Sequence, residues 1–522
     1  MQLPVKVGIA AGSAFVFFLT VGFVVFPKMI TSQVKKMTAL KPGNEIRDMF
    51  IKIPFYLDFR IFMFNISNPD GIQNGEKPIV QQVGPFCYEE WKVKVGVEDI
   101  EEEDMLMYNQ TDTFLPANWP GCVDPDTMVT IPHPMILGLV NAVTIQKPGA
   151  LSLLNKAIKS IYENPSNIFL TAKAKDILFD GIVIKCGIKD FAGKAICSQL
   201  KSALPNLNEN DLIFSLLGAK NGTAGKRFQV YRGVKNAHQL GEIVKYDNQS
   251  VIENWPTKQC NEIHGTDGTI FPPFLTNEEG LVSFSPDLCR SLKAFFVKPE
   301  NYDGIPAKMF TANLGDSSTN ANEKCYCTTP ETCLKKGLMD LFKCTGVPIY
   351  ASLPHFLDAD KSYLDGVQGL SPDAEIHQIK ILFETTTGSP LYAKKRLQFN
   401  MPLNANDKVD LFKTMPSSVL PLFWIEEGVE LNNTFTKPLK DLFKIKKIVK
   451  IGTWLVMVVS VVLMAGAAYV YFSKSGSANV TPVEKSDTPD NVKNMIHMNM
   501  NYGMNDEGHV NPNMTNGDPD KY

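Results

Sequence analysis

Cysteine is the residue of this chain whose type and spacing point most directly to chemistry. The sequence has ten cysteines, and six of them crowd into its middle: Cys260, Cys289, Cys325, Cys327, Cys333 and Cys344. Cysteine thiolates bind zinc, but structural zinc sites carry paired C-x₂₋₄-C spacings, which Cys325-x-Cys327 lacks. In an oxidising compartment such cysteines form disulfides instead. We therefore predict a disulfide cluster over residues 260–344, although many pairings of six cysteines are possible.

The other four cysteines lie N-terminal to that cluster. Cys186 and Cys197 are close enough in sequence to form a local bridge, whereas the sequence assigns no partners to Cys87 and Cys122. Each bridge would contribute about 2–4 kcal/mol to stability, chiefly because it restricts the unfolded chain.

Signatures of enzyme chemistry are missing. The sequence contains no G-x-S-x-G elbow, no H-E-x-x-H, no P-loop and no Rossmann glycine pattern. Its seven histidines are scattered, and His355, in the apolar segment Ser-Leu-Pro-His-Phe-Leu, is interpreted as structural. Residues 265–269 (Gly-Thr-Asp-Gly-Thr) are interpreted as a turn, and the acidic residues 98–104 as a solvated loop or edge. We predict that the protein is not an enzyme and that it has no catalytic residue, metal site or cofactor.

The composition excludes other classes of function. The chain has 522 residues, 44% of them hydrophobic and 20% charged, which is ordinary for a globular protein. Its net charge is −3 and it has no dense basic block, so nothing indicates nucleic-acid binding.

Two long apolar segments lie on either side of the body that contains the cysteines. Residues 7–26 carry no charge between Lys6 and Lys28, and residues 451–472 lie in the same way between Lys450 and Lys474. At roughly 1.5 Å per residue each segment spans the roughly 30 Å of hydrocarbon in a bilayer. We predict a cytoplasmic N-terminus (1–6), an uncleaved signal-anchor helix (7–26), a large body (27–450), a second transmembrane helix (451–472) and a disordered tail (473–522).

The first apolar segment contains Gly8-x-x-x-Gly12, a spacing that lets membrane helices approach closely. This face could pair with the second segment, with another copy of the chain, or with the helix of a partner receptor.

The side of the membrane on which the body lies follows from two signals. Lysines flank the body at both ends, against the positive-inside rule, but long domains translocate largely regardless of charge. All ten cysteines lie in the body, and so do five glycosylation sequons, at Asn65, Asn109, Asn221, Asn248 and Asn432. Two further sequons, Asn479 and Asn513, lie in the tail. We predict an extracellular body with both termini in the cytoplasm.

Apolar periodicity divides the body into strands and helices. Period-two alternation predicts strands at residues 57–61 and 91–98. Further strand-like segments, with Gly, Pro and Asn between them, are residues 228–232, 242–246, 378–384 and 396–400. Residues 83–86 (Val-Gly-Pro-Phe) predict a turn. Helical spacing predicts short amphipathic helices within residues 135–179, the last of them at 169–179. The fold class is therefore α+β: an antiparallel β structure with an inserted helical cluster.

The helical cluster has two interpretations. Its apolar faces could simply pack within the fold, or the cluster could be a mobile cap that admits a ligand. The residues that would contact a ligand there are Leu151, Leu154, Lys156, Lys159, Phe169, Lys173 and Lys175.

Several segments resemble the class B scavenger receptor family. They are residues 58–65 (Asp-Phe-Arg-Ile-Phe-Met-Phe-Asn), 83–86 (Val-Gly-Pro-Phe), 265–274 (Gly-Thr-Asp-Gly-Thr-Ile-Phe-Pro-Pro-Phe), 287–291 (Asp-Leu-Cys-Arg-Ser), 352–357 (Ser-Leu-Pro-His-Phe-Leu), 393–398 (Ala-Lys-Lys-Arg-Leu-Gln) and 420–425 (Leu-Pro-Leu-Phe-Trp-Ile). The match extends from the first apolar segment through the second. Within the family, residues 84–91 (Gly-Pro-Phe-Cys-Tyr-Glu-Glu-Trp) and 421–428 (Pro-Leu-Phe-Trp-Ile-Glu-Glu-Gly) are most like insect sensory neuron membrane proteins of the first type.

The resemblance implies an antiparallel β-barrel-like ectodomain with a membrane-distal helical cluster and an internal hydrophobic tunnel, tethered by two transmembrane helices. It also implies the pairings Cys260–Cys325, Cys289–Cys344 and Cys327–Cys333. Relatives use a lysine of the cap to bind anionic lipids. The matching position here holds no lysine and lies near Glu163, which favours neutral ligands.

The function that the resemblance implies is that of an olfactory co-receptor in the plasma membrane of a sensory neuron. It would capture lipid-derived hydrophobic ligands such as fatty-acid-derived pheromones and pass them to the membrane or to an odorant receptor complex. One alternative is a general scavenger or lipoprotein receptor without conduction. A ligand-gated channel is a further alternative, but the second apolar segment lacks a Gly-x-Ser filter.

Overall fold

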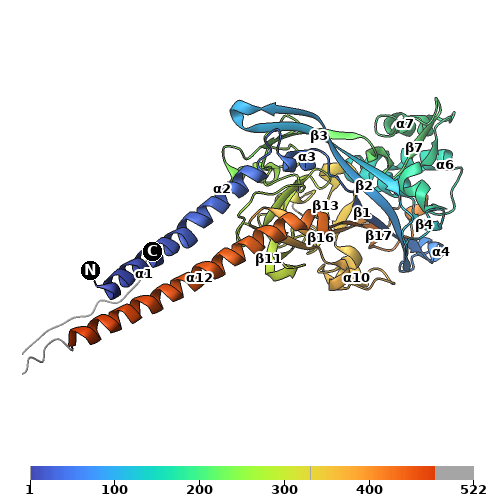
Figure 1. Cartoon of the computed structure of the whole chain (residues 1–522). Coiled ribbons are helices and arrows are strands. Elements are labelled where there is room, and N and C mark those ends of the chain that lie inside the picture. The colour runs from blue at the N-terminus through green and yellow to red at the C-terminus, as the bar shows by residue number, and fades with distance from the viewer. Residues whose placement is uncertain (1, 330, 477–522) are drawn as a thin grey trace, which may run out of the picture. The chain divides into compact units, whose positions relative to one another are not determined.

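The computed structural model describes residues 2–329 and 331–476 of the chain (Figure 1). These residues form two compact units. The body begins at residue 14 and ends at residue 458, and the other unit comprises described residues 2–13 and 459–476 of the two terminal helices.

The body is built on one antiparallel sheet of 13 strands. Their order is β10-β11-β12-β15-β16-β17-β1-β2-β3-β8-β9, and β13 pairs with β14, which pairs with β16. The strands of this sheet are β1 (Leu57–Ile66), β2 (Val80–Ile100), β3 (Met105–Pro116), β8 (Ala224–Tyr231), β9 (Ile243–Tyr246), β10 (Leu281–Ser285), β11 (Arg290–Tyr302), β12 (Ile305–Thr311), β13 (Leu338–Asp340), β14 (Tyr350–Ser352), β15 (Lys380–Glu384), β16 (Ser389–Leu403) and β17 (Ser418–Glu430).

Residues 265–266 connect the two outer strands of this sheet. Ile243 of β9 donates its backbone N–H to the carbonyl of Gly265 at 2.9 Å. Thr266 donates to the carbonyl of Val282 in β10 at 3.1 Å and accepts from Phe284 at 2.8 Å. The segment predicted as a turn is therefore also a strap, and it gives the body the barrel-like closure that the resemblance implies.

Alternating burial explains why these segments are strands. In β1 the side chains at residues 57, 59, 61 and 63 are buried and those between them are half-buried, as expected when one face of a strand packs on a core. The six strands predicted from sequence are confirmed: they lie in or overlap β1, β2, β8, β9, β15 and β16.

The turn predicted at residues 83–86 is wrong. Strand β2 runs without a break through a cis Gly84–Pro85 peptide bond, and its pairing with β1 shifts register between Ile61 and Met63. A bulge absorbs the extra residue and accommodates a proline that a regular strand position would exclude.

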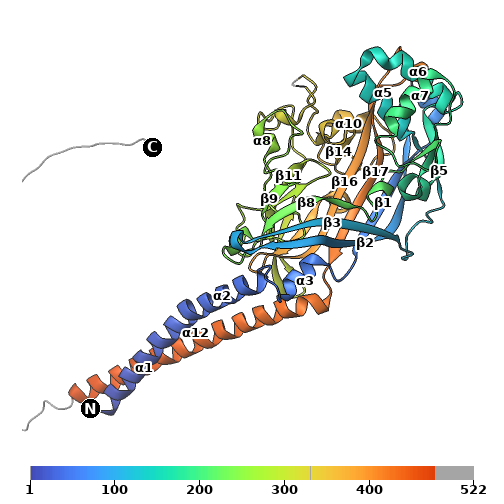
Figure 2. The same cartoon turned by 90° about the horizontal axis from the view of Figure 1, so that it is seen from above.

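The helical cluster, or cap, covers one end of the body, opposite the end that α2, α3 and α12 reach (Figure 2). Its elements are β4 (Met128–Pro132), α5 (Pro134–Gln146), α6 (Leu151–Ile161), β5 (Phe169–Lys173), β6 (Ile182–Lys185), α7 (Phe191–Leu200) and β7 (Asp211–Phe214). The helix predicted at residues 169–179 is wrong for residues 169–173, which form β5, whereas residues 174–179 are helical. Strand β5 pairs with β4 along its whole length, and a π-helical turn, Asp176–Asp180, follows it.

The apolar core beneath the cap is the largest in the body. It contains Phe59, Phe86, Tyr88, Leu154 and Trp424, all buried. Five disulfides join the ten cysteines: Cys87–Cys122, Cys186–Cys197, Cys260–Cys325, Cys289–Cys344 and Cys327–Cys333. The last three are the pairs that the resemblance implies, and the first joins the two cysteines that the sequence left unassigned.

Two long helices begin and end the described chain. The first comprises α1 (Leu3–Thr20), a π-helical turn (Val21–Val25) and α2 (Phe26–Thr38); the second is α12 (Asn433–Gly476). The remaining short helices are α3 (Glu45–Ile51), α4 (Pro69–Gln73), α8 (Lys258–Asn261), α9 (Phe342–Thr345), α10 (Lys361–Asp365) and α11 (Ala374–His377). Both long helices are apolar enough to cross a membrane, and they include the two predicted apolar segments.

The Gly8/Gly12 face contacts the chain's own second helix. A Cβ added at Gly8 would lie 3.7 Å from the Cβ of Ala467, and one added at Gly12 would lie 3.6 Å from the Sδ of Met464. Of the three roles left open by the sequence, the structure shows the first. Contact of this face with a receptor stays a prediction. Of the tail predicted as disordered (473–522), residues 473–476 belong to α12. The rest, with Asn479 and Asn513, lies outside the described residues.

Candidate ligand cavity and its charged belt

A cavity of about 530 Å³ is lined in part by α2, α3 and α12. These helices reach the end of the body opposite the cap (Figure 2). Helices α2, α3 and α12 and strands β2, β16 and β17 contribute to its walls. Its volume is within the range of about 300–1,000 Å³ that is usual for small-molecule sites. Helices α2 and α12, which form part of its walls, continue along the chain into the two predicted apolar segments.

Helical spacing brings apolar side chains into this cavity. Positions i, i+4 and i+7 of a helix share one face. That spacing aims one side of α2 and one side of α12 into the cavity, and α3 adds further apolar groups. The apolar side chains so placed are Ile30, Val34, Met37, Ile46, Met49, Phe50, Phe435, Leu439 and Leu442.

The sheet side of the cavity carries charge. We define the charged belt as Glu90, Lys92, Asp112, Lys395 and Glu427, and Lys92, Lys395 and Glu427 line the cavity itself. Cross-strand register explains how they meet: residue 92 of β2 lies opposite residue 112 of β3, and residue 395 of β16 lies opposite residue 427 of β17.

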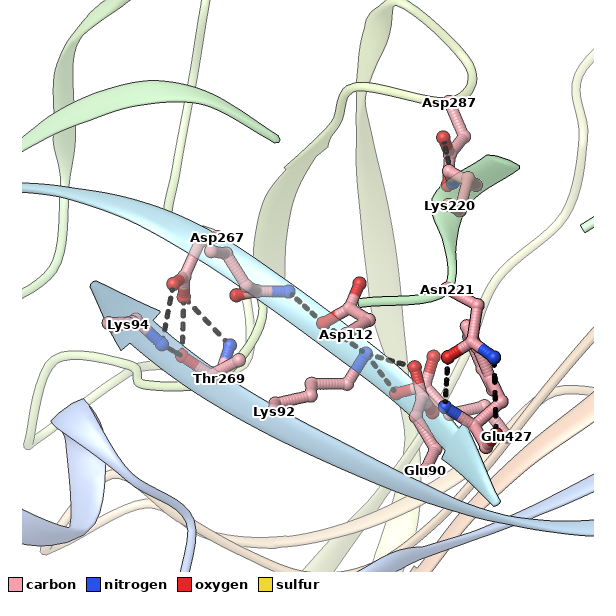
Figure 3. Close-up of polar contacts among 12 residues, drawn as sticks. Glu90, Lys92, Lys94, Asp112, Lys220, Asn221, Asp267, Thr269, Asp287 and Glu427 are labelled. Atoms are coloured by element: carbon pink, nitrogen blue, oxygen red, sulfur yellow. Dashed lines mark hydrogen bonds and ion pairs between the residues drawn. The ribbon is translucent and has the colours of Figure 1, made fainter. Parts of the chain in front are cut away.

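Lys92 is the centre of the belt (Figure 3). Its Nζ lies 2.5 Å from Glu90 Oε1, 3.7 Å from Asp112 Oδ1 and 4.0 Å from Glu427 Oε1. Lys395 Nζ lies 3.3 Å from the same Glu427 oxygen. Two ammonium groups therefore face three carboxyl groups.

Burial and neighbouring charges set the protonation of the belt. Burial raises the pKa of Glu90 to about 7, and Lys92 only partly opposes that rise. Burial also raises the pKa of Glu427, but Lys395 and Lys92 outweigh it and hold this pKa at about 2. Burial lowers the pKa of Lys92, but Glu427 and Glu90 outweigh it and raise this pKa above its ordinary value. With Glu90 protonated, the belt carries equal positive and negative charge.

A second buried ion pair lies beside the belt (Figure 3). Lys94 Nζ is 3.2 Å from Asp267 Oδ2, and Tyr108 donates its hydroxyl to the same carboxylate at 2.7 Å. The ring of Phe50, a residue of α3, lies 4.0 Å from the Lys94 ammonium. Burial raises the pKa of Asp267, but Lys94 and the hydrogen bonds from Tyr108 and Thr269 outweigh it and lower the pKa below its ordinary value. The strap is therefore held in place by the buried carboxylate of Asp267, which is both ion-paired and hydrogen-bonded.

The belt separates the cavity from the core under the cap. Alternate residues from 423 to 431, along β17 and one residue beyond its end, show this. Phe423 and Ile425 belong to the core under the cap, Glu427 belongs to the belt, and Val429 and Leu431 line the cavity. The tunnel that the resemblance implies stays a prediction; along β17, the belt lies between the cavity and that core.

The residues predicted from sequence as ligand contacts all lie in the cap, and none of them lines this cavity. Leu151 and Leu154 are buried in the core. Lys159 pairs with Asp410 at 2.7 Å. Lys173 and Lys175 both pair with Asp126, at 3.5 Å and 2.8 Å. Lys156 is exposed and Phe169 half-buried. Their contact with a ligand stays a prediction.

The five sequons of the body differ in their surroundings. Asn65 accepts a hydrogen bond from the Thr130 N–H at 2.8 Å, and Asn109 donates one to the Gly225 carbonyl at 2.8 Å. The sequons with exposed asparagines are Asn221, Asn248 and Asn432. Glycosylation of any of them stays a prediction.

Sequence reasoning missed the cavity, although signals for it were present. The i, i+4, i+7 apolar spacing of α12 begins before the second apolar segment, and the strand around Trp91 carries Lys92 and Lys94 on one face. What no local pattern contains is the register that brings β2 next to β3 and β16 next to β17.

Comparisons with known proteins agree with this architecture. The CD36 family matches residues 9–471. Sensory neuron membrane protein 1 of Ostrinia furnacalis is 43% identical over 481 residues, covering 90% of this chain and 91% of the relative. The same-named proteins of Apis mellifera and Manduca sexta are 43% and 42% identical, and each covers 92% of this chain; the shares of these relatives covered are 94% and 95%.

The helices and the relatives together define the broad class. Two apolar helices at the ends of the described chain, and relatives named as membrane proteins, make this a two-pass membrane protein with a large folded body. Its similarity extends from the first apolar segment into the second and matches the family resemblance inferred from sequence. This chain belongs to the CD36 family.

Proposed function

We propose that this protein is a co-receptor of sensory neurons that takes up lipid-derived hydrophobic ligands and passes them to the membrane or to an odorant receptor. In this proposal residues 27–450 are extracellular, residues 7–26 and 451–472 cross the plasma membrane, and both termini are cytoplasmic. The observation that carries it is the apolar cavity formed by helices that continue into the predicted spans.

The physical case rests on the cost of exposing a hydrocarbon chain to water. Each buried methylene contributes about 0.8 kcal/mol, so a long-chain ligand leaves an apolar site only for another apolar surrounding. A cavity beside the membrane spans lets such a ligand transfer to lipid with little exposure. No energy source is required, because the transfer runs downhill.

The charge of the cap supports capture at the other end. Residues 128–214 contain nine lysines and six acidic side chains, whereas the whole chain has a net charge of −3. A local excess of positive charge raises the rate at which anionic partners or particles arrive. The names of the relatives, which refer to sensory neurons, support the cell type.

A plug in the cavity tests this proposal. Val429→Trp would fill the space between β17 and the helices, while Val297→Trp, at a side chain 47% exposed on β11, is the matched control. In neurons lacking the native protein, the plugged variant should reach the surface normally but restore little of the response to a long-chain ligand. The control should restore it fully. Normal sensitisation by the plugged variant would contradict the proposal.

One observation favours the alternative of a docking receptor without conduction. The charged belt lies between the cavity and the core under the cap. Native mass spectrometry of the full chain in nanodiscs separates the two functions. Retention of single lipid molecules supports a conduit, whereas binding of intact lipid particles with no single lipid retained supports docking.

A further inference from the structure

Lys395 is the member of the charged belt best placed to meet a ligand. Its side chain is 45% exposed and lines the cavity, whereas the side chain of Lys92 is 10% exposed. Within the described chain its one ion-pair partner is Glu427, at 3.3 Å. An ammonium group has three N–H donors, so Lys395 retains donors that can be directed into the cavity.

The charges around Lys395 decide which head group it can receive. The positive charges of Lys92 and Lys395 are matched by Asp112 and Glu427, and Glu90 adds a third carboxyl group. Two neighbouring cations, Lys94 and Lys220, are paired with Asp267 and Asp287. The belt is therefore neutral or negative as a whole. A carboxylate placed there would lose its hydration without a net positive charge to replace it.

A neutral oxygen meets no such penalty. A hydroxyl, aldehyde or ester oxygen accepts a hydrogen bond from an ammonium group and adds no charge to the site. The rest of the cavity wall is largely apolar and extends from the belt to Ile30 of α2 and Leu442 of α12. An amphiphile whose oxygen lies at the belt would therefore direct its tail along these helices.

We propose that the charged belt is a head-group subsite. Lys395 Nζ donates a hydrogen bond to the oxygen of a neutral long-chain alcohol, aldehyde or ester, and the hydrocarbon tail fills the cavity between α2, α3 and α12. The ligand thus lies with its head toward the body and its tail toward the predicted membrane spans. This inference rests on the proposed function and specifies its ligand class and orientation.

Ligand competition on the full-length protein in nanodiscs tests the head-group preference. The probes share sixteen carbons and differ in their head: hexadecane, hexadecanol, hexadecanal and hexadecanoic acid. Wild-type protein should bind the alcohol and aldehyde about tenfold more tightly than hexadecane, the size expected of one hydrogen bond to a charged group. The acid should bind no more tightly than the alcohol.

Variants of Lys395 assign that preference to its ammonium group. Lys395→Met keeps the length of the side chain and removes its donors, so the preference for the alcohol should fall to about twofold or less while hexadecane binding stays unchanged. Lys395→Arg should restore the preference. The control is Lys361→Met, which removes an exposed lysine paired with Asp365 on α10 and should change nothing. Lys395→Gln provides a second test if the methionine variant does not fold.

The outcomes separate this inference from the proposed function. An unchanged preference in Lys395→Met, or an acid that binds about tenfold more tightly than the alcohol, would overturn the subsite and leave the cavity standing. Failure of all four probes, hexadecane included, to bind would overturn the proposed function as well.

Photo-cross-linking tests the orientation of the bound ligand. Hexadecanol with a diazirine at its terminal carbon should cross-link to α2 or α12. Cross-links from that carbon to β2 or β17 beside the belt would show the reverse orientation and overturn this part of the proposal.

Discussion

His355 and His377 stack ring to ring inside the body, with their centroids 4.4 Å apart. His355 Nδ1 accepts the Ser371 N–H at 3.0 Å, and its Nε2 lies 2.7 Å from Gln82 Oε1, so Nε2 carries the proton of a neutral ring. Burial, and then the neighbouring His377, lower the pKa of His355 to about 4. The sequence predicted a structural histidine here, and the hydrogen bonds agree with that role.

The lowered pKa makes the stability of the fold sensitive to acid. The unfolded chain binds a proton at His355 near pH 6.5, while the folded chain resists it down to about pH 4. The unfolded state therefore binds more protons in this window, and stability falls as the pH drops below about 6.5. From pH 7 to 5 the loss should be about 2 kcal/mol, or less because the site is not fully dry.

Chemical denaturation of the protein at pH 7 and pH 5 measures this effect. His355→Gln should reduce the difference in unfolding free energy between the two pH values, whatever it does to stability itself. Burial also lowers the pKa of His133 to about 4, so part of the acid sensitivity should remain in that variant. An undiminished pH difference in His355→Gln would show that His355 is not the source.

The strap at residues 265–266 gives a test at the scale of an element, because a single glycine closes the sheet there. Gly265 has φ +80°, and an added Cβ would lie 2.2 Å from the carbonyl oxygen of Val282. Gly304 has a similar φ of +84°, but an added Cβ would meet nothing within 4 Å. Gly304→Ala should cost about 1 kcal/mol from the backbone conformation alone.

Gly265→Ala should cost about 3 kcal/mol or more, because the strap must move away from β10 or the strand must shift. Thermal unfolding of the two variants checks the difference. Equal effects of both substitutions would mean that the strap is not needed to hold the sheet closed.

The strands illustrate how far sequence could predict this fold. The alternation of buried and half-buried residues in β1 is local, so period-two patterning found it. Residues 169–179 have helical spacing, and 174–179 are helical, but pairing of β5 with β4 outweighs that preference at 169–173. Glu427 and Lys92 are more than three hundred residues apart, and only the register of the folded sheet brings them to one cavity wall. The fold class was accessible from pattern and resemblance; the charged belt was not.

The sidedness of the whole molecule can be tested through its sequons. A glycan must remain solvated after folding, so the exposed Asn248 and Asn432 are expected to carry one. Asn65 is half-buried and hydrogen-bonded to Thr130, so it is expected to carry none. In cells, Asn248→Gln and Asn432→Gln should each increase electrophoretic mobility by one glycan, and Asn65→Gln should not. A protein with no glycan at any sequon would contradict an extracellular body.

The two terminal helices give a prediction that involves the molecule as a whole. Within the body unit a Cβ added at Gly22 would lie 2.4 Å from Thr453 Cγ2, and Phe23 packs edge to face on Trp454 with ring centroids 6.0 Å apart. Small residues let membrane helices approach in this way. Gly22 lies in the π-helical turn Val21–Val25, and single π-helical turns within α-helices are frequent at functional sites.

Gly22→Ile should therefore force the first helix away from α12 and loosen α2, which lines the ligand cavity. Gly452→Ile is the matched control, because an added Cβ there meets nothing within 4 Å. In nanodiscs the first variant should raise hydrogen exchange in α2 by about tenfold or more, as local opening becomes easier. The control should leave exchange unchanged. If both variants behaved alike, the contact between the helices would not be what holds the cavity wall in place.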